Sequence, residues 1–378
     1  MLGLTAAAAS VAANTAVAAE WTVEPGAQLT TQAQNNARMS ADGGDTETSI
    51  GAQAGVQMAR RTERLELTSS TRVYFQRYQH DTGLDRNDQQ LDLALHWNGE
   101  HLSWTGTAAA TRDTTLTSEL GTTALTQSNR RHESYDFSLG PSWNMSERLS
   151  MGSSVGLQIN RYPGPSPGLT DYRFGTANLN AGYQLSDRAS VSLVGSAGHF
   201  SSGNSSTSTD NASVRLQAQY AWAELWTLNG GAGPSWIEAN HRRQQGVVYS
   251  ASVSRRLELS SLSLSASRSQ SPSGFGILTN TDDVKLSFST QIRERLTGSL
   301  SAGLTRRKDA LPALGLELPE VRYRQIDASL AWQVAPSWGL VLGANNRAQR
   351  AATLSGSALA NSYEALLTLN WTGSSHVF

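Results

Sequence analysis

Apolar and polar residues alternate with a period of two in segment after segment of this chain. Residues 91–98, for example, read LDLALHWN. The same pattern returns over residues 135–145, 212–222, 284–289, 326–334 and 364–371. A period of two puts one face of a strand against an apolar medium and the other against water. Because the sequence holds no comparable stripe of period 3.6, we expect an all-β fold.

The polar half of each segment consists mainly of Ser, Thr, Gly, Asn and Gln. Charged residues make up only 16% of the 378 residues, against about 25% in an average soluble chain. A face of such small polar residues cannot repay by burial the entropy that is lost on ordering. The same face suits a water-filled lumen whose outer side meets lipid. We therefore predict a transmembrane antiparallel up-and-down β-barrel, in which closure also removes unpaired strand edges.

Short charged turns separate pairs of these segments. They lie at residues 61–64, 99–101, 146–148, 186–188, 223–225, 255–258, 293–295 and 335–337. Eight turns separate nine hairpins and predict 18 strands, with 16 as the alternative because the first hairpin (residues 21–35 and 50–60) is weakly patterned. A repeat of this length also occurs in propellers and solenoids, but those folds need the apolar interior that this chain lacks.

Longer segments rich in Gly, Ser, Asp, Asn and Pro lie between the turns. They cover residues 80–87, 113–130, 162–170, 201–210, 240–245, 271–280, 308–321 and 351–361. Short turns at one end and long loops at the other are typical of outer-membrane barrels. We expect the turns to be periplasmic and the loops to be extracellular.

Tryptophan residues flank the short turns. We expect them to form a periplasmic aromatic girdle, because an indole ring favours the interface between membrane and water. The predicted girdle consists of Trp97, Trp104, Trp143, Trp222, Trp226, Trp332, Trp338 and Trp371.

The continuous apolar stretch of the chain lies at its start. Residues 1–19 are Ala-rich and end in small residues, as a secretory signal peptide does. No Lys or Arg precedes the apolar region, so either the signal is weak or the start codon lies upstream of Met1. We expect residues 20–378 to form a single barrel domain in the bacterial outer membrane.

Composition excludes several classes of function. The chain has no Cys, which excludes disulfide scaffolds, thiol catalysis and Cys-ligated zinc. A net charge of −1 argues against nucleic-acid binding. Two matches to G-x-S-x-G, at residues 152–156 and 164–168, lack the strand-to-helix context of a nucleophile elbow. The best His–carboxylate candidate, His96 beside Asp92, is expected to be a solvated pair facing the lumen. We therefore predict no enzyme activity, no cofactor and no metal site.

Arginine greatly outnumbers lysine: Lys285 and Lys308 are the two lysines among 30 basic residues. Guanidinium groups bind carboxylates and phosphates in a bidentate manner, so we predict anion contacts in the lumen and at its mouth. The candidates are Arg72, Arg77, Arg112, Arg130, Arg131, Arg215, Arg242, Arg243, Arg306, Arg307 and Arg347. The arginine bias would also arise from a GC-rich genome, or from pairing of arginines with lipopolysaccharide phosphates, and both alternatives stay open.

A recurring turn sequence carries a family resemblance. Residues 61–65 read RTERL, residues 146–149 SERL and residues 293–296 RERL, and the last residue is Phe378. Together with the length, this pattern resembles the outer-membrane β-barrel proteins of proteobacteria, and most closely the porins encoded beside exopolysaccharide and PEP-CTERM gene clusters. The resemblance implies three partners: outer-membrane lipid and lipopolysaccharide, the barrel-assembly machinery, and a periplasmic polysaccharide synthase or export complex.

The last strand departs from the usual pattern of such barrels. Leu367, Leu369 and Trp371 are out of phase with Phe378. We expect either a β-bulge near Gly373 or a short tail that ends in Phe378.

Three functions follow from these predictions. The first is a conduit for exopolysaccharide export. The second is a general or anion-preferring diffusion porin, which an inward-folded segment at residues 113–130 would favour. The third is a structural or adhesive surface barrel with a closed lumen, which ranks last because an 18-stranded interior is too wide for short Ser and Thr side chains to fill.

Overall fold

The computed structural model describes residues 19–118, 129–164, 168–203, 208–310, 320–353 and 356–378. Most of the predicted signal peptide and parts of five predicted loops lie outside these ranges. The described part of the chain is almost entirely strands. They are β1 (Glu20–Asn35), β2 (Thr46–Arg61), β3 (Leu65–Tyr78), β4 (Arg86–Asn98), β5 (Leu102–Thr114), β6 (Arg131–Asn144), β7 (Leu149–Arg161), β8 (Tyr172–Ser186), β9 (Ala189–Ser202), β10 (Ser208–Ala223), β11 (Trp226–Ala239), β12 (Arg242–Arg256), β13 (Ser260–Ser273), β14 (Ile277–Arg293), β15 (Leu296–Asp309), β16 (Val321–Ala335), β17 (Trp338–Thr353), β18 (Gly356–Thr372) and the short β19 (His376–Val377).

Two short helical segments, a 3₁₀ turn at Thr82–Leu84 and α1 at Thr115–Ser118, lie between strands. Within the described ranges, no helix has the length and apolar character that a membrane span requires.

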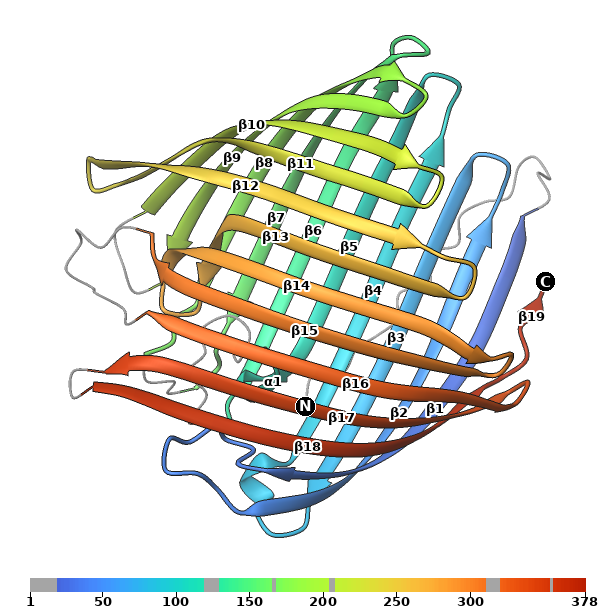
Figure 1. The fold of residues 1–378 in the computed structure, drawn as a ribbon, viewed down its shortest axis with the longest axis vertical. Helices are drawn as coiled ribbons and strands as arrows, with labels where there is room; N and C mark the ends of the chain where they lie inside the picture. Colours follow the sequence, from blue (N-terminus) through green and yellow to red (C-terminus); the bar gives the residue numbers. More distant parts are fainter. Residues whose placement is uncertain (1–18, 119–128, 165–167, 204–207, 311–319, 354–355) are drawn as a thin grey trace.

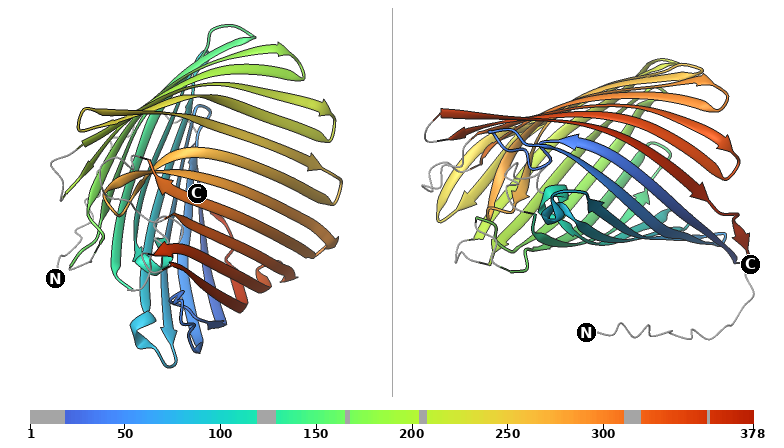
Figure 2. Two further views of the ribbon diagram at one scale, coloured as in Figure 1. Left: turned by 60° about the vertical axis from the view of Figure 1, so that its left-hand side comes forward. Right: turned by 90° about the horizontal axis from the view of Figure 1, so that it is seen from below.

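The strands form one closed antiparallel barrel (Figure 1). Each long strand pairs with its neighbours in sequence, and β1 also pairs with β18 from Gly26↔Thr372 to Gln34↔Glu364. The closing strands, blue β1 and red β18, meet in the right-hand view of Figure 2. The weakly patterned first hairpin is fully paired, from Glu20↔Arg61 to Asn35↔Thr46. The prediction of 18 strands is therefore confirmed, and 16 is wrong.

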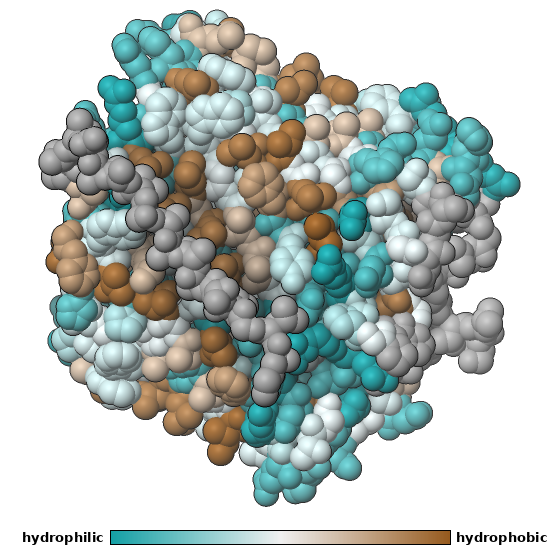
Figure 3. Space-filling view, turned by 180° about the vertical axis from the view of Figure 1, so that it is seen from behind, coloured by the Kyte–Doolittle hydropathy of each residue, from teal (hydrophilic) through white to brown (hydrophobic). Residues whose placement is uncertain are grey.

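Alternation along the strands sorts the side chains between two environments. The apolar face points outward and is exposed, as at Leu193 (53%), Leu216 (61%) and Leu304 (56%). Many residues of the other parity, such as Thr30, Ser49 and Gln76, are buried inside the barrel. Figure 3 shows one outward face, where hydrophobic side chains gather across the surface and hydrophilic ones lie towards its rims. A closed barrel with an outward apolar band is a structure of the bacterial outer membrane.

The eight predicted turns all connect consecutive strands at one end of the barrel. At the other end several predicted loops are shorter than expected. Only Asn240 and His241 lie between β11 and β12. Both have positive φ values, 51° and 61°, as the central residues of a tight two-residue hairpin turn do. The expected loop at residues 271–280 is likewise a hairpin, with only residues 274–276 between β13 and β14. Polar residues at these strand ends continue the strands, because the ladder hydrogen bonds do not require an apolar side chain.

A one-residue bulge explains why Trp371 and Phe378 are out of phase in the sequence. In the pairing of β1 with β18, Gly26 lies opposite Thr372, whereas Val23 lies opposite His376 and Thr22 opposite Val377. The register has therefore shifted by one residue around Gly373, and the parity of the strand is inverted beyond it. Phe378 then returns to the outward phase and exchanges two backbone hydrogen bonds with Trp21, at 3.3 and 3.0 Å. The bulge prediction is confirmed.

One hairpin leaves the wall of the barrel at the end opposite the eight short turns, which is called the outer end below. The pairing of β12 with β13 stops at Tyr249↔Arg268, although both strands continue outward. Figure 1 shows the left-hand ends of these two strands diverging. Beyond this point Gln270 Nε2 donates to Ser235 Oγ on β11 at 3.2 Å, and Thr170 N donates to Gly274 O at 2.8 Å. The tip of the β13–β14 hairpin therefore folds inward, under β8–β11.

An apolar cluster holds this tip. It contains Phe200 (1% exposed), Ile237 (2%) and Leu278 (2%), together with Tyr162, Tyr172, Ala239 and Ala310. Phe200 and Ile237 have lumen-facing parity, so the cluster fills the outer end of the lumen beside β8–β11.

Candidate functional site

The lumen contains a polar cavity of about 560 Å³ against the wall formed by β1–β5, β17 and β18. The period-two pattern of each strand directs the polar lining residues inward. Amides, hydroxyls and charged groups are mixed in the lining, which includes Gln28, Thr30, Gln32, Gln53, Arg72, Tyr74, Arg86, Asp88, Gln90, Asp113, Thr117, Glu364 and Thr368. The cavity therefore offers many hydrogen-bonding groups and few apolar ones.

Arg72 is the exposed cation of this cavity. It lies on β3 opposite Gly55 of β2. A Cβ atom at position 55 would lie 2.8 Å from the Thr71 carbonyl oxygen and 3.3 Å from Cγ of Arg72, so glycine leaves room for the arginine stem. Within the described residues, no hydrogen bond or ion pair engages the guanidinium of Arg72. This group is therefore available to a solute.

Arg86, in contrast, is held by the protein. Its Nε donates to Gln76 Oε1 at 2.7 Å, and its Nη1 donates to Thr117 Oγ1 at 2.7 Å. The guanidinium also lies over the ring of Tyr74, 4.9 Å from the ring centroid, and 3.6 Å from Asp88. The polar composition of residues 80–87 predicts a loop, whereas Arg86 is the first residue of β4.

The contacts of Arg86 fix the start of the predicted constricting segment. Thr117 belongs to α1 and lines the cavity, while Thr115 is 1% exposed and accepts a hydrogen bond from Arg130 N at 3.0 Å. Residues 113–118 thus fold against the cavity, and residues 119–128 lie outside the described residues.

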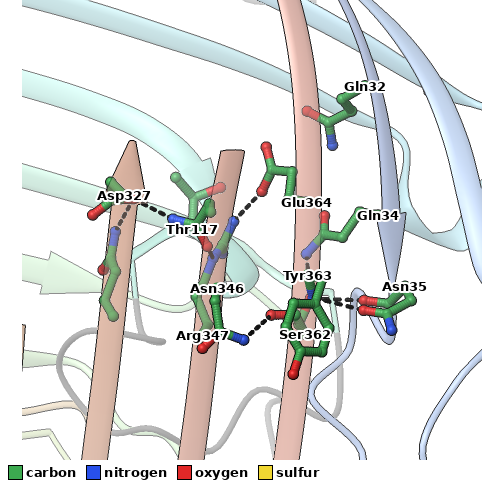
Figure 4. A network of polar contacts seen from close by, with 12 residues as sticks. Gln32, Gln34, Asn35, Thr117, Asp327, Asn346, Arg347, Ser362, Tyr363 and Glu364 are labelled. Atoms are coloured by element: carbon green, nitrogen blue, oxygen red, sulfur yellow. Dashed lines mark hydrogen bonds and ion pairs between the residues drawn. The ribbon is translucent and has the colours of Figure 1, made fainter. Parts of the chain in front are cut away.

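A second set of polar contacts neutralises charges on β16–β18 (Figure 4). Arg347 forms an ion pair with Glu364 and donates to Asn345 Oδ1 at 3.0 Å. Asp327 accepts from Asn345 and, at 2.9 Å, from Gln325 Nε2. The charges of this wall therefore have partners within the chain.

The adjoining stretch of the wall, on β12–β16, is lined by serines in register. Ser254 lies opposite Ser263, Ser263 opposite Ser287, and Ser287 opposite Ser301. A parallel row includes Ser299 and Ser329, whose hydroxyl oxygens lie 2.7 Å apart. A cavity of about 460 Å³ lies against these rows. This wall therefore presents short hydroxyl side chains to the lumen.

A buried histidine network joins residues that no sequence pattern links. His132 Nδ1 lies 2.8 Å from Asp113 Oδ1, and His132 Nε2 lies 2.8 Å from Asn160 Oδ1. Only the pairing of β5 with β6 and of β6 with β7 brings these residues together, so no local motif reveals them. The predicted pair is different: Asp92 bonds to Ser70 at 3.2 Å, while His96 lies 3.4 Å from Thr105.

The predicted arginine candidates fall into separate groups. Arg72, Arg215, Arg307 and Arg347 have lumen-facing parity, and Arg242 has the same parity at the tip of the β11–β12 hairpin. Arg130 lies between α1 and β6. The outward-facing group consists of Arg77, Arg112, Arg131, Arg243 and Arg306. The role of all these residues in anion contacts stays a prediction.

The eight predicted girdle tryptophans have outward parity at the turn end of the barrel. Trp97 lies opposite Trp104, and Trp338 lies opposite Trp371. The ring centroids of Trp222 and Trp226 are 6.4 Å apart. Their position within the membrane interface stays a prediction.

Among the described residues, no three or more His, Asp or Glu side chains are grouped so as to hold a metal ion.

Comparison with known proteins identifies no family. No protein-family model matches the chain, and no curated protein matches its sequence. Similar solved structures include the outer membrane protein OpdK from Pseudomonas aeruginosa, with 11% identity and a TM-score of 0.48 over 94% of this chain and 99% of that chain. The siderophore receptor PirA from the same organism has 8% identity and a TM-score of 0.44, over 92% of this chain and 80% of that chain. At these values the similarity concerns the barrel fold alone.

Proposed function

We propose that this protein is an outer-membrane diffusion pore for small hydrophilic solutes that carry an anionic group. The observation that carries the proposal is Arg72, an exposed guanidinium in a lumen cavity of about 560 Å³ with no partner among the described residues. Two lumen carboxylates, in contrast, are engaged: Glu364 forms an ion pair with Arg347, and Asp136 accepts a hydrogen bond from Ser134 at 2.8 Å. An entering carboxylate or phosphate would therefore meet an unsatisfied cation.

The groups around Arg72 suit a solute rich in hydroxyls. Gln28, Gln53 and Gln90 share the cavity with Arg72 and offer both donors and acceptors. The serine rows on β12–β16 add hydroxyl groups on a second part of the lumen wall. A hydroxylated acid of sugar size could form hydrogen bonds with both walls as it passes.

Export of an exopolysaccharide, the first expectation from sequence, is a weaker proposal. Residues 113–118 and the β13–β14 hairpin both occupy lumen that an extended polymer would need. The inward-folded segments instead favour a pore with a constriction.

Reversal potentials in planar bilayers test the proposal. With a KCl gradient across the membrane, we expect the wild-type pore to favour Cl⁻ and Arg72→Glu to favour K⁺. Exchanging one positive for one negative charge about 10 Å from a passing ion changes its energy by about 0.8 kcal/mol at the dielectric constant of water. That energy corresponds to about a fourfold change in local ion concentration.

A matched control is Arg173→Gln, which removes an outward-facing arginine at the outer end of β8. It should leave the permeability ratio unchanged. A barrel that inserts but passes no current would support the structural-barrel alternative. A conducting pore whose ion preference ignores Arg72→Glu would contradict the role of Arg72.

A further inference from the structure

A row of charged side chains crosses the outward face near the outer ends of β13–β17. The strand register places Arg268 opposite Asp282, Asp282 opposite Arg306, Arg306 opposite Arg322, and Arg322 opposite Arg350. All five share the outward parity of their strands. Side chains in direct register on one face have Cβ atoms about 5 Å apart. The row therefore forms one continuous surface feature, although its members are far apart in sequence.

Positive charge dominates the β15–β17 part of this row. Arg268 and Asp282 neutralise each other with two hydrogen bonds of 2.5 and 2.8 Å. Arg306, Arg322 and Arg350 then follow on three successive strands, and like charges in direct register destabilise a sheet. Lys308 and Arg324 extend the positive charge on the same face.

One described carboxylate, that of Glu320, forms ion pairs with three of these cations. Glu320 accepts from Arg306 at 2.8 and 2.7 Å and from Arg322 at 2.7 Å, and lies 3.7 Å from Lys308 Nζ. Besides Asp282, which Arg268 engages, the described residues of this patch place five basic groups around one acidic group. Several of the basic groups remain exposed, with 41% exposure at Arg306 and 61% at Arg322.

Apolar side chains continue the same face towards the turn end of the barrel. Leu304, Ile326 and Leu342 have outward parity, and their exposures are 56%, 38% and 55%. The surface is therefore amphipathic, with cations at its outer edge and exposed apolar side chains on the membrane side. A ligand that matches it carries several negative charges above acyl chains.

We propose that the outward face of β15–β17 binds a multiply phosphorylated glycolipid of the outer leaflet. Its phosphates contact Arg306, Arg322 and Arg350, and its acyl chains pack against Leu304, Ile326 and Leu342. Guanidinium groups suit this role because they bind phosphate through two parallel N–H donors. The phosphates also relieve the repulsion between arginines in direct register. The proposal does not depend on whether the pore conducts.

Native mass spectrometry of the detergent-solubilised full chain tests this proposal. The probes are bisphosphorylated lipid A and the same lipid with both phosphates removed. We expect the wild type to bind the bisphosphorylated lipid more tightly. The triple variant R306Q/R322Q/R350Q should lose at least about tenfold in affinity, because a hydrogen bond to a charged group contributes about that factor or more.

The matched control is R77Q/R173Q/R243Q, which removes three outward-facing arginines on separate strands β3, β8 and β12. It should bind the lipid as the wild type does. The single variant R322Q, which removes an arginine side chain that is 61% exposed, gives a second measurement if the triple variant folds poorly; it should weaken binding in the same direction. Heat-modifiable gel mobility reports folding in each case.

Three results would overturn the proposal. The first is equal binding of the phosphorylated and dephosphorylated lipids. The second is an equal loss of affinity in the control triple variant, which would indicate general surface charge. The third is full displacement of the lipid by inorganic pyrophosphate, which would identify a site for free phosphate with no contribution from acyl chains.

Discussion

The inward-folded tip of the β13–β14 hairpin should control the width of the pore, and Leu278→Ala tests this directly. Leu278 is 2% exposed and packs in the cluster with Phe200 and Ile237. Burying one leucine side chain contributes about 2–3 kcal/mol. The two hydrogen bonds that hold the tip, Gln270–Ser235 and Thr170–Gly274, contribute about 1 kcal/mol each. The docked tip is therefore favoured by a few kcal/mol.

Truncating Leu278 to alanine costs about 3 kcal/mol, within the range for buried leucines. This shifts the equilibrium between docked and undocked hairpin by about a hundredfold and leaves the two states close in free energy. In single-channel recordings we expect Leu278→Ala to switch between the wild-type conductance and a larger one. Leu264→Ala is the control, because Leu264 lies on the same hairpin, faces outward and is 44% exposed. It should conduct as the wild type does.

Cysteines introduced at Ser235 and Gln270, whose side chains are in contact at 3.2 Å, provide the opposite perturbation. The natural chain has no Cys, so an engineered pair has no competitor. Oxidation of this pair in the Leu278→Ala background should abolish the larger conductance, and reduction should restore it. If Leu278→Ala inserts as a heat-modifiable barrel and shows only the wild-type conductance, the hairpin does not limit the pore.

Three further predictions concern the wall of the barrel. Gly233→Ala should prevent folding into the heat-modifiable form, because a Cβ there collides with the backbone of β10; Gly230→Ala on the same strand, with no atom within 4 Å of its Cβ, should fold normally. Hydrogen bonds from Arg306 and Arg322 lower the pKa of Glu320 from 4.5 to about 2, so its contribution to stability is complete above pH 4.5 and is lost as the pH falls towards 2. Arg306→Gln should raise this pKa, as measured by NMR of the carboxyl carbon. Trp222→Ala should reduce the free energy of folding into lipid vesicles by about 1 kcal/mol, the contribution of one aromatic pair, and an unchanged value would argue against the girdle.

The strands and turns were predictable because they depend on local patterns. The alternation over residues 91–98 is enough to predict the strand that contains them, β4. The RER sequence at residues 293–295 forms the turn from β14 to β15, as expected. The expected loops at residues 240–245 and 271–280 were wrong for a related reason. Polar composition there predicts that the strands end, whereas beyond the apolar band a strand needs only its backbone partners.

The inward hairpin depends on contacts that no local pattern contains. Leu278 meets Phe200 only after β9 and β14 are both in place in the closed barrel. The His132–Asp113 contact is of the same kind, because it follows from the pairing of β5 with β6. Such contacts require the register of several strands at once, and a single sequence does not supply that register.

The arginine candidates show that the parity of a residue along its strand, and not its type, decides which surface of the barrel it faces. Arg306 and Arg307 are adjacent, yet Arg306 faces outward beside Glu320 while Arg307 has lumen-facing parity. Leu304 has outward parity, so the period of two alone already separates the two arginines. One residue type therefore lies on two different surfaces: Arg72 has lumen-facing parity, and Arg306 lies on the outward face of the barrel. Mutations at the two positions should accordingly have independent effects, with ion selectivity responding to the first and lipid binding to the second.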